Sequence, residues 1–461
     1  MRTTEAARKP DPSGLAVVPP RSEDAIGRSA LRKASLRLLP LIGLGYGIAF
    51  MDRVNISFAA LQMNRDLHFS ETVFGLGAGL FFLTYAALEI PSNLVMVRIG
   101  ARRWLARIML TWGLISIAMM LVRTPAEYYT GRLLLGAAEA GFFPGVIYYL
   151  MQWFPAGERA KAISRFYISF PLSTVVMGGL AGWLLHLNGR LHLAGWQWLL
   201  LAEGLPAVLM SAAFLLCLPS GPGKAAWLTD GEREWIRRRL ASEPRRGAHS
   251  EQDLARAFRD PRVWLLGGFN FFLLMAAYGY TFSAPQLVKQ VTGLGNTGTG
   301  LVVAGIGVLG ALAMLINGWH TDKTGDRRWH IVLPVLVLAA GYVAAGSSTR
   351  PVVVLPALAV IFCGLTAVLA PFWTIPPEFL QGRSAAAGIA TINMIGILGG
   401  FAGPSLMGVL TDWTGGFQRG LLVLAVPGLL CALLMEVTHR YSVRQKVVAV
   451  AATELIAASE S

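Results

Sequence analysis

Long apolar segments alternate with short polar ones along most of the chain. A helix needs about 20 predominantly apolar residues to cross a hydrocarbon core of about 30 Å. The pattern therefore predicts twelve membrane-spanning helices. They are expected near residues 38–61, 72–97, 104–122, 126–151, 163–186, 196–217, 263–288, 299–319, 330–346, 351–372, 384–409 and 419–438. Because the number is even, both ends of the chain are expected on the same side of the membrane.

Composition agrees with this interpretation. Hydrophobic residues make up 54% of the 461 residues and charged residues only 14%, which differs strongly from an average soluble domain. The three cysteines lie in apolar segments, and the seven histidines lie at span ends or in loops without the spacing of metal ligands. We therefore expect no cofactor, no metal and no enzymatic activity.

The basic residues follow the loops. A formal net charge of +14 in a soluble protein would suggest a nucleic-acid partner. Here the two ends of the chain and the even-numbered loops contain most of the 40 Lys and Arg residues, whereas the odd-numbered loops contain six. Basic residues accumulate on the cytoplasmic side of membrane proteins. Both termini are therefore expected in the cytoplasm, with the chain in the inner (plasma) membrane and no nucleic acid as partner.

A polar interruption divides the spans into six and six. Hydropathy falls between Pro219 and Arg262, and residues 229–240 have the charge pattern of a short helix. The sequence thus predicts a disordered cytoplasmic tail over 1–37, an N-terminal six-helix bundle over 38–218, a cytoplasmic linker with a short helix over 219–262, a C-terminal six-helix bundle over 263–440 and a cytoplasmic tail over 441–461.

The two halves share short motifs. The sequence Gly178-Gly-Leu-Ala-Gly182 returns as Gly399-Gly-Phe-Ala-Gly403, and Arg98-Ile-Gly-Ala-Arg-Arg103 returns as Lys323-Thr-Gly-Asp-Arg-Arg328. Parallel repeats that bind substrate between them near the membrane midplane are a known transporter plan. The fold class predicted is therefore an all-α membrane protein with two six-helix bundles and a binding cavity between them.

The loop after the eighth span has a pattern with a physical use. It begins with Gly318, contains Gly325, and carries the charged residues Asp322, Lys323, Asp326, Arg327 and Arg328. Its cations favour the cytoplasm, and an acid near a helix N-terminus is favoured by the helix dipole. We expect Asp322, Lys323, Arg327 and Arg328 to latch neighbouring helix ends during gating. The simpler alternative is an ordinary basic loop anchored by its charge.

With this loop the chain resembles the major facilitator superfamily. The signature loop of that family lies between spans two and three, has a copy between spans eight and nine, and combines Gly, Asp, Gly and two basic residues. The first copy departs from the pattern, because Asn93 and Val97 stand where Gly and Asp are usual. The resemblance implies the twelve-helix fold already expected from the hydropathy.

Two pairs of ionisable residues lie inside predicted spans, Asp52 and Arg53 in the first and Arg132 and Glu139 in the fourth. Charge at that depth is costly, so each is a functional candidate. At about 1.5 Å per residue, Asp52 and Arg132 share a level and can pair. Arg132 and Glu139, seven residues apart, project from one helix face. A fixed cation beside titratable acids is what coupling a carboxylate to protons requires. The alternative is two structural ion pairs, Asp52–Arg132 and Arg53–Glu139.

The segments around these residues resemble one branch of the superfamily, the anion:cation symporters, which include permeases for tartrate, galactonate, phthalate and hydroxyphenylacetate. The resemblance covers residues 36–440. Its most specific elements are Met51-Asp52-Arg53-Val54-Asn55, Tyr85 with Glu89-Ile-Pro91-Ser-Asn93, Gly131-Arg132 to Glu139-Ala-Gly-Phe-Phe-Pro144, and Trp153-Phe-Pro155 to Glu158-Arg159-Ala.

This resemblance implies roles for individual residues. Asp52 and Glu139 would be the proton-coupling acids. The substrate-binding residues would be Arg53, Tyr85, Arg132, Trp373 and Asn393. Phe50 stands where sugar-acid members have a tyrosine, which removes one hydroxyl from the expected site.

Together these features predict a secondary active transporter that imports a small organic anion by proton symport and alternating access. Its partners would be the anion, protons and lipid, and it is expected to act as a monomer. The expected substrate is a tartrate-like hydroxy-dicarboxylate, while sugar acids and aromatic acids are also compatible with the pattern. Two alternatives remain. A proton-coupled drug or metabolite exporter shares the fold, although its usual proline–glycine signature in span five is missing. A transporter-like membrane sensor would need an output domain, for which a linker of about 44 residues is short.

Overall fold

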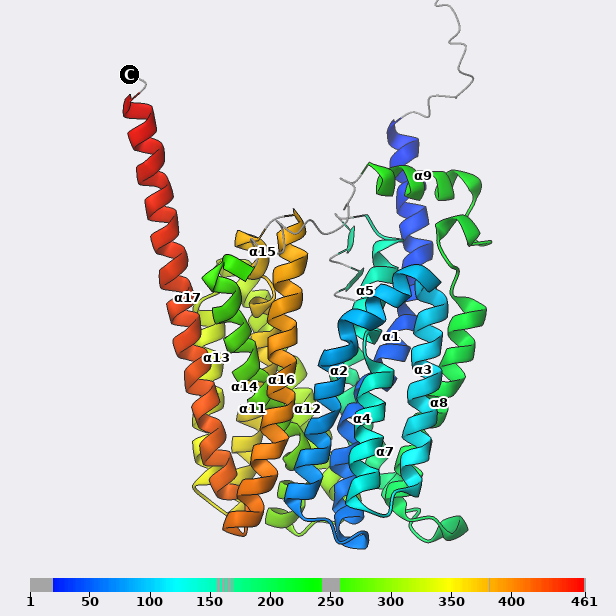
Figure 1. Cartoon of the computed structure of the whole chain (residues 1–461), viewed down its shortest axis with the longest axis vertical. Helices are drawn as coiled ribbons and strands as arrows, with labels where there is room; N and C mark the ends of the chain where they lie inside the picture. Colours follow the sequence, from blue (N-terminus) through cyan, green and yellow to red (C-terminus); the bar gives the residue numbers. More distant parts are fainter. Residues whose placement is uncertain are drawn as a thin grey trace, which may run out of the picture.

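The computed structural model describes residues 20–155, 158–159, 162–163, 166, 169–242, 258–380 and 382–459. Helices account for nearly all of these residues, as the apolar pattern predicts. They form two groups that stand side by side, one from each half of the chain, joined by a linker that carries the short helix α9 (Asp230–Ala241) (Figure 1). The predicted all-α architecture is confirmed.

The bounds of the helices define the two halves. The N-terminal half contains α1 (Pro20–Asp66), α2 (Glu71–Ile99), α3 (Ala101–Ala118), the short helix η1 (Met119–Leu121), α4 (Pro125–Glu139), α5 (Phe142–Met151), α7 (Ser169–Leu185) and α8 (Gly195–Cys217). The C-terminal half contains α11 (Pro261–Thr292), α12 (Asn296–Thr324), α13 (Trp329–Gly346), α14 (Pro351–Phe372), α15 (Pro376–Phe379), α16 (Gly382–Thr414) and α17 (Phe417–Ser459). The start of α1 and the end of α17 lie at the same end of the molecule, here called the terminal end (Figure 1).

Eleven helical segments of the described residues are long and apolar enough to cross a membrane, whereas the sequence predicts twelve spans. The remaining predicted span, 163–186, coincides with α7. Its described apolar stretch, Leu172–Leu185, is shorter than a full span, and part of the predicted segment lies outside the described residues. The difference between eleven and twelve spans therefore depends on how much of this one helix lies within the described residues.

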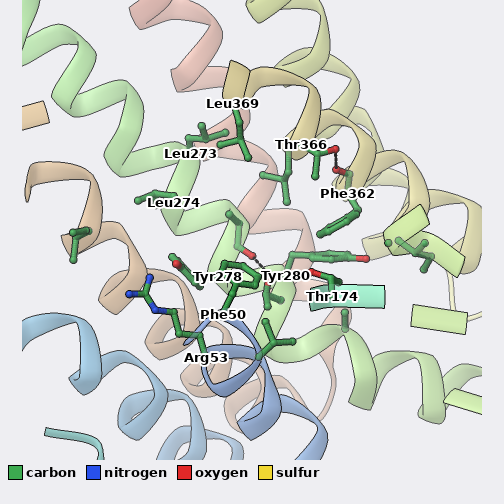
Figure 2. A pocket seen from close by; sticks show the side chains of 18 of the residues that line it. Phe50, Arg53, Thr174, Leu273, Leu274, Tyr278, Tyr280, Phe362, Thr366 and Leu369 are labelled. Atoms are coloured by element: carbon green, nitrogen blue, oxygen red, sulfur yellow. Dashed lines mark hydrogen bonds between the residues drawn. The ribbon is translucent and has the colours of Figure 1, made fainter. Parts of the chain in front are cut away.

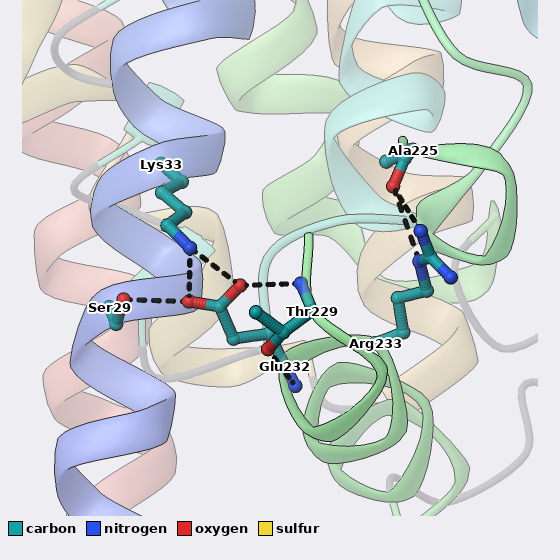
Figure 3. Close-up of polar contacts among 6 residues, drawn as sticks. All are labelled: Ser29, Lys33, Ala225, Thr229, Glu232 and Arg233. Atoms are coloured by element: carbon teal, nitrogen blue, oxygen red, sulfur yellow. Dashed lines mark hydrogen bonds and ion pairs between the residues drawn. The ribbon is translucent and has the colours of Figure 1, made fainter. Parts of the chain in front are cut away.

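The prediction of a disordered tail over 1–37 is wrong in its second part, because α1 already begins at Pro20. Residues 1–19 lie outside the described residues. The composition of this segment does not reveal that α9 of the linker packs against it. The buried carboxylate of Glu232 in α9 accepts hydrogen bonds from Ser29 at 2.7 Å and Lys33 at 2.8 Å (Figure 3). A segment that is polar by composition is thus held in a helix by contacts from the linker.

Local sequence explains why α9 forms where it does. Thr229 and Glu232 make a reciprocal capping box, in which each side chain accepts from the other residue's backbone N–H. Burial raises the pKa of the Glu232 carboxyl, but hydrogen bonds from Lys33 and Ser29 outweigh it and lower this pKa to about 2. Glu232 is therefore ionised at neutral pH and serves both the cap and the contact with α1.

Two spans are interrupted at corresponding places in the two halves. The fourth breaks between α4 and α5, where Gly141 adopts a left-handed conformation with φ 86°. The tenth breaks between α14 and α15, and Trp373 is the residue that caps the end of α14. Interrupted helices in matching positions of two repeats are a common feature of transporter binding sites.

At the end opposite the termini, the two halves touch. The carboxylate of Asp412 in α16 accepts hydrogen bonds from the backbone N–H groups of Glu71 at 3.0 Å and Thr72 at 2.7 Å, at the start of α2. A negative charge there is favoured by the α2 dipole. Gly75 and Gly408 allow the two helices to approach so closely that a Cβ at either position would overlap the facing backbone. The halves are therefore in tight contact at this end.

Candidate functional site: a cavity between the two halves

A cavity of about 200 Å³ lies between the halves and is lined by both. Figure 2 shows Phe50 and Arg53 of α1 on one side and Tyr278, Tyr280 and Thr366 of the C-terminal half on the other. Its lining residues are Tyr46, Phe50, Arg53, Val54, Phe58, Tyr85, Phe143, Thr174, Asn270, Leu273, Leu274, Ala277, Tyr278, Tyr280, Thr281, Ala284, Pro285, Val303, Ile306, Gly307, Phe362, Leu365, Thr366, Leu369, Trp373, Asn393 and Ile397. The walls are mostly apolar and aromatic, with few polar groups.

Arg53 supplies the positive charge of this cavity. Its guanidinium Nη2 lies 2.5 Å from Oε1 of Glu139, and its Nε donates to the same oxygen at 2.9 Å. The guanidinium also lies over the ring of Tyr85, 4.9 Å from the centroid. Its side chain is 18% exposed, whereas that of Glu139 is 0% exposed. The cavity therefore reaches the arginine but not its acidic partner.

The position of Glu139 follows from the break in its span. It is the last residue of α4, directly before the turn at Ala140 and Gly141. One carboxylate oxygen, Oε1, is engaged by Arg53, while Oε2 is buried without a hydrogen-bond partner. A buried charge with one unsatisfied oxygen is costly. The pair thus combines strong attraction with an incomplete set of hydrogen bonds.

Asp52 and Arg132 are both buried, but they do not form the ion pair that their equal depth allows. Asp52 Oδ1 accepts from the hydroxyl of Ser116 in α3 at 2.7 Å. Arg132 donates to the backbone carbonyls of Gly77 at 3.4 Å and Ala78 at 3.3 Å in α2. Equal depth allowed a pair, but α2 packs against α4 and offers carbonyl groups closer to the guanidinium. Arg132, Asp52 and Glu139 also lie outside the cavity lining.

The other predicted substrate-binding residues lie at the cavity. Tyr85, Trp373 and Asn393 all contribute to its lining, Trp373 from the break after α14. The amide of Asn393 donates to Oε1 of Glu89 in α2 at 3.5 Å, a contact between the two halves. Glu89 received no role in the sequence analysis, although it belongs to a quoted motif, because its depth alone does not reveal this contact.

Two further polar residues, Asn270 and Glu203, lie inside the spans and are not among the predicted site residues. Asn270 donates to the carbonyl of Ile392 at 3.2 Å, which is a packing contact, but it also lines the cavity. Glu203 in α8 accepts a hydrogen bond from the amide of Asn55 in α1 and is 2% exposed. The signal that could have distinguished Glu203 is its isolation, since an acid in an apolar span without a nearby base is costly.

The predicted latch residues divide into two groups. Arg327 forms an ion pair with Glu378 of α15, and Arg328 lies 2.6 Å from Glu436 of α17, so both connect the α12–α13 loop to other helices of the same half. Lys323 instead lies over the Trp319 ring at 5.2 Å. The structure records no hydrogen bond or ion pair for the side chain of Asp322, itself a described residue.

Three comparisons relate this chain to known proteins. The family model of the Major Facilitator Superfamily matches residues 42–404. A protein of Agrobacterium vitis provisionally named a tartrate transporter is 45% identical over 413 residues, which cover 89% of this chain and 92% of that protein. The quinolone resistance transporter of Acinetobacter baumannii is 38% identical over 425 residues, which cover 91% of this chain and 97% of that protein.

Among solved structures, a bacterial homologue of the human lysosomal transporter Spinster, in an inward-facing and unoccupied conformation, has a TM-score of 0.75 at 17% identity and covers 88% of this chain and 97% of that chain. That similarity shows the fold. The family match and the apolar helices identify a multi-pass membrane transporter rather than an enzyme. The chain belongs to the major facilitator superfamily.

Proposed function

We propose that the protein imports a tartrate-like hydroxy-dicarboxylate, or a closely related carboxylate, together with protons. The observation that carries this proposal is the position of Arg53, which reaches the cavity while its guanidinium is ion-paired with the fully buried Glu139. An arginine fork binds carboxylates bidentately and does not deprotonate. The same guanidinium can therefore bind either Glu139 or a substrate carboxylate.

This competition gives a mechanism for coupling. When Glu139 is ionised, it holds Arg53 and opposes the binding of an anion. Protonation of Glu139 removes that attraction, so that Arg53 becomes available to the substrate carboxylate in the cavity. Release of the substrate restores the ion pair and expels the proton. Proton and anion would thus bind together and leave together, which is the requirement for symport.

The distribution of basic residues supports a cytoplasmic position for the terminal end. The contacts of Asp412 with the start of α2 then close the outer end of the molecule, which corresponds to an inward-facing state. The similarity to an inward-facing solved structure supports this interpretation. Alternating access would break these contacts and separate α2 from α16 at the outer end.

The small set of polar groups in the cavity supports a compact, polar anion. Arg53 could bind one carboxylate, and Asn270 and Asn393 lie on the facing half with amide groups suited to a second carboxylate or a hydroxyl. The provisional name of the Agrobacterium vitis relative, a tartrate transporter, supports the same class.

Transport by the purified protein in proteoliposomes tests the proposal. Radiolabelled tartrate should accumulate under an inward proton gradient, and a protonophore should abolish that accumulation. Glu139→Gln should retain tartrate exchange but lower gradient-driven accumulation, because position 139 then has no proton to release. Glu234→Gln, a change in the linker helix α9 away from the cavity, is the control and should behave as the unmodified protein. Full accumulation by Glu139→Gln would refute the coupling role.

An exporter of aromatic compounds is the second candidate. The aromatic walls of the cavity and the similarity to a quinolone resistance transporter favour it. The same proteoliposomes distinguish the two functions: an exporter would move a quinolone against an opposite proton gradient and would ignore tartrate.

A further inference from the structure

Glu203 belongs to a second group of buried carboxyl groups, separate from the Arg53–Glu139 pair. The group lies where α1, α3 and α8 meet and consists of Asp52, Asn55, Ser116 and Glu203, each 2% exposed or less. Asp52 and Asn55 are three residues apart on α1, so they lie on the same face of that helix. None of the four residues lines the cavity.

Both acids in this group lack part of their hydrogen bonding. Glu203 Oε2 accepts from the amide of Asn55, but Oε1 is buried without a partner. Asp52 Oδ1 accepts from Ser116, but Oδ2 is likewise buried without a partner. The donors recorded for these two carboxyl groups are neutral: the amide of Asn55, the hydroxyl of Ser116 and the indole N–H of Trp112. Neutral donors do not compensate for burying a full negative charge.

Cations act on Asp52 but not on Glu203. Arg53 and Arg132 exert an electrostatic attraction on Asp52, whereas the charged group that acts on Glu203 among the described residues is Asp52 itself. Two of the elements packed against α8, α7 and η1, add no charge near Glu203. The described residues of α7 and η1 contain no ionisable side chain. On α3, Arg102 binds the carbonyl of Leu215, about 18 Å along α8 from Glu203.

Close packing excludes lipid and water from the group. Gly113 of α3 and Gly204 of α8, the neighbour of Glu203, approach so closely that a Cβ on either would lie less than 3 Å from the other's carbonyl oxygen. Ser116 lies one helical turn beyond Gly113 and contacts Asp52. The two helices therefore enclose the carboxyl groups at this depth instead of leaving them at the surface of the bundle.

We propose that Glu203 is a further proton-binding residue beside Asp52, for which the family resemblance already implies proton coupling, and that Glu203 is loaded in this conformation and releases its proton during the transport cycle. The proposal rests on the proposed proton symport and adds a site to it. Two buried acids within electrostatic reach of each other, with neutral donors, are stable when a proton neutralises one of them, and they repel each other when both are ionised. Asp52 precedes Arg53, so a movement of α1 that frees Arg53 also changes the contacts of this group.

Infrared spectroscopy of the purified full-length protein tests proton binding independently of transport. At neutral pH the carboxylic-acid carbonyl band of Glu203→Gln should lose the area of one group. Glutamine keeps an acceptor for Asn55, so the fold should survive. Glu232→Gln is the matched control, because Glu232 is also buried but is paired with Lys33 and ionised, so its removal should leave the band unchanged. An unchanged band in Glu203→Gln would overturn the proposal.

Tartrate accumulation in proteoliposomes tests whether the proton moves. Each coupled proton multiplies the accumulation ratio by about tenfold per pH unit of gradient, so Glu203→Gln should lower this ratio by about tenfold at a gradient of about one unit while retaining exchange. A reduced band with full accumulation would show a permanently bound proton and overturn the transport role. If the unmodified protein shows no proton-driven accumulation, the proposed symport fails, while the infrared result still decides whether Glu203 holds a proton.

Discussion

The two halves of this protein share an architecture but differ in the chemistry they place near the cavity. Among the described residues, the charged side chains buried within membrane spans belong to the N-terminal half: Asp52, Arg132, Glu139 and Glu203. The buried polar side chains of the C-terminal half are amides and hydroxyls, such as Asn270 and Thr366. This difference suggests that the N-terminal half holds the charge and the protons, whereas the C-terminal half shapes the cavity around the substrate.

Removal of the charge at Arg53 should have the largest effect. Arg53→Met leaves Glu139 without a counter-ion and removes the cation from the cavity, so both tartrate exchange and accumulation should fall by at least about a hundredfold, in line with the about 3–5 kcal/mol lost when a buried pair is broken. Initial uptake rates in proteoliposomes measure this. Arg123→Met, at an exposed position, should retain transport. Comparable loss in both variants would contradict a specific role for Arg53.

The contact between the halves provides the next test. A Cβ at Gly408 would overlap the carbonyl of Glu71, so Gly408→Val should hold the outer end open. Transport should then fall by about tenfold, because about 1.4 kcal/mol of bias changes a conformational equilibrium tenfold. The measurement uses a protein whose native cysteines are replaced by serine, with spin labels at Arg123→Cys and Arg350→Cys, one on each half. The distance between the two labels should be longer in Gly408→Val than in the protein with Gly408. Gly305→Val, where a Cβ meets open space, should leave their distance unchanged.

A change in the C-terminal half should alter affinity without altering coupling. Asn393→Ala removes one amide hydrogen bond from the cavity, which is worth about 0.5–1.5 kcal/mol, so the KM for tartrate should rise about two- to tenfold. The accumulation ratio at saturating tartrate should remain that of the unmodified protein. If Asn393→Ala lowered this ratio as Glu139→Gln is expected to do, the division of tasks between the halves would be wrong.

The smallest effect is expected at the linker. Because the pKa of Glu232 in the folded protein, about 2, lies below its unfolded value of about 4.3, its pairing stabilises the fold above that unfolded value and is lost as pH falls toward 2. Glu232→Gln should therefore lower Tm by about 1–2 °C at neutral pH. The difference from the unmodified protein should shrink between pH 4.3 and 2. A difference that persists below pH 2 would contradict the ion pair as its source.

Most residues of the site could be predicted from the sequence, but which acid pairs with which arginine could not. Hydropathy gave the depth of Asp52, Arg53, Arg132 and Glu139, and each of them is inside a span as expected. Depth alone allowed Asp52–Arg132 as readily as Arg53–Glu139. Only the second pair exists, because helix rotation turns Asp52 toward Ser116 and Arg132 toward the carbonyls of α2.

The sequence by itself determined the helical spans, the division into two halves and the residues able to carry charge within the membrane, since these depend on the local need of each segment to bury its backbone and apolar side chains. Tertiary structure decided which partner each polar group found. It also decided that Asp52, which accepts from Ser116, and Glu203, which accepts from Asn55, belong to one enclosed group. It decided as well that α1 extends beyond the predicted span. Those outcomes depend on how helices distant in sequence rotate and pack, which no local pattern records.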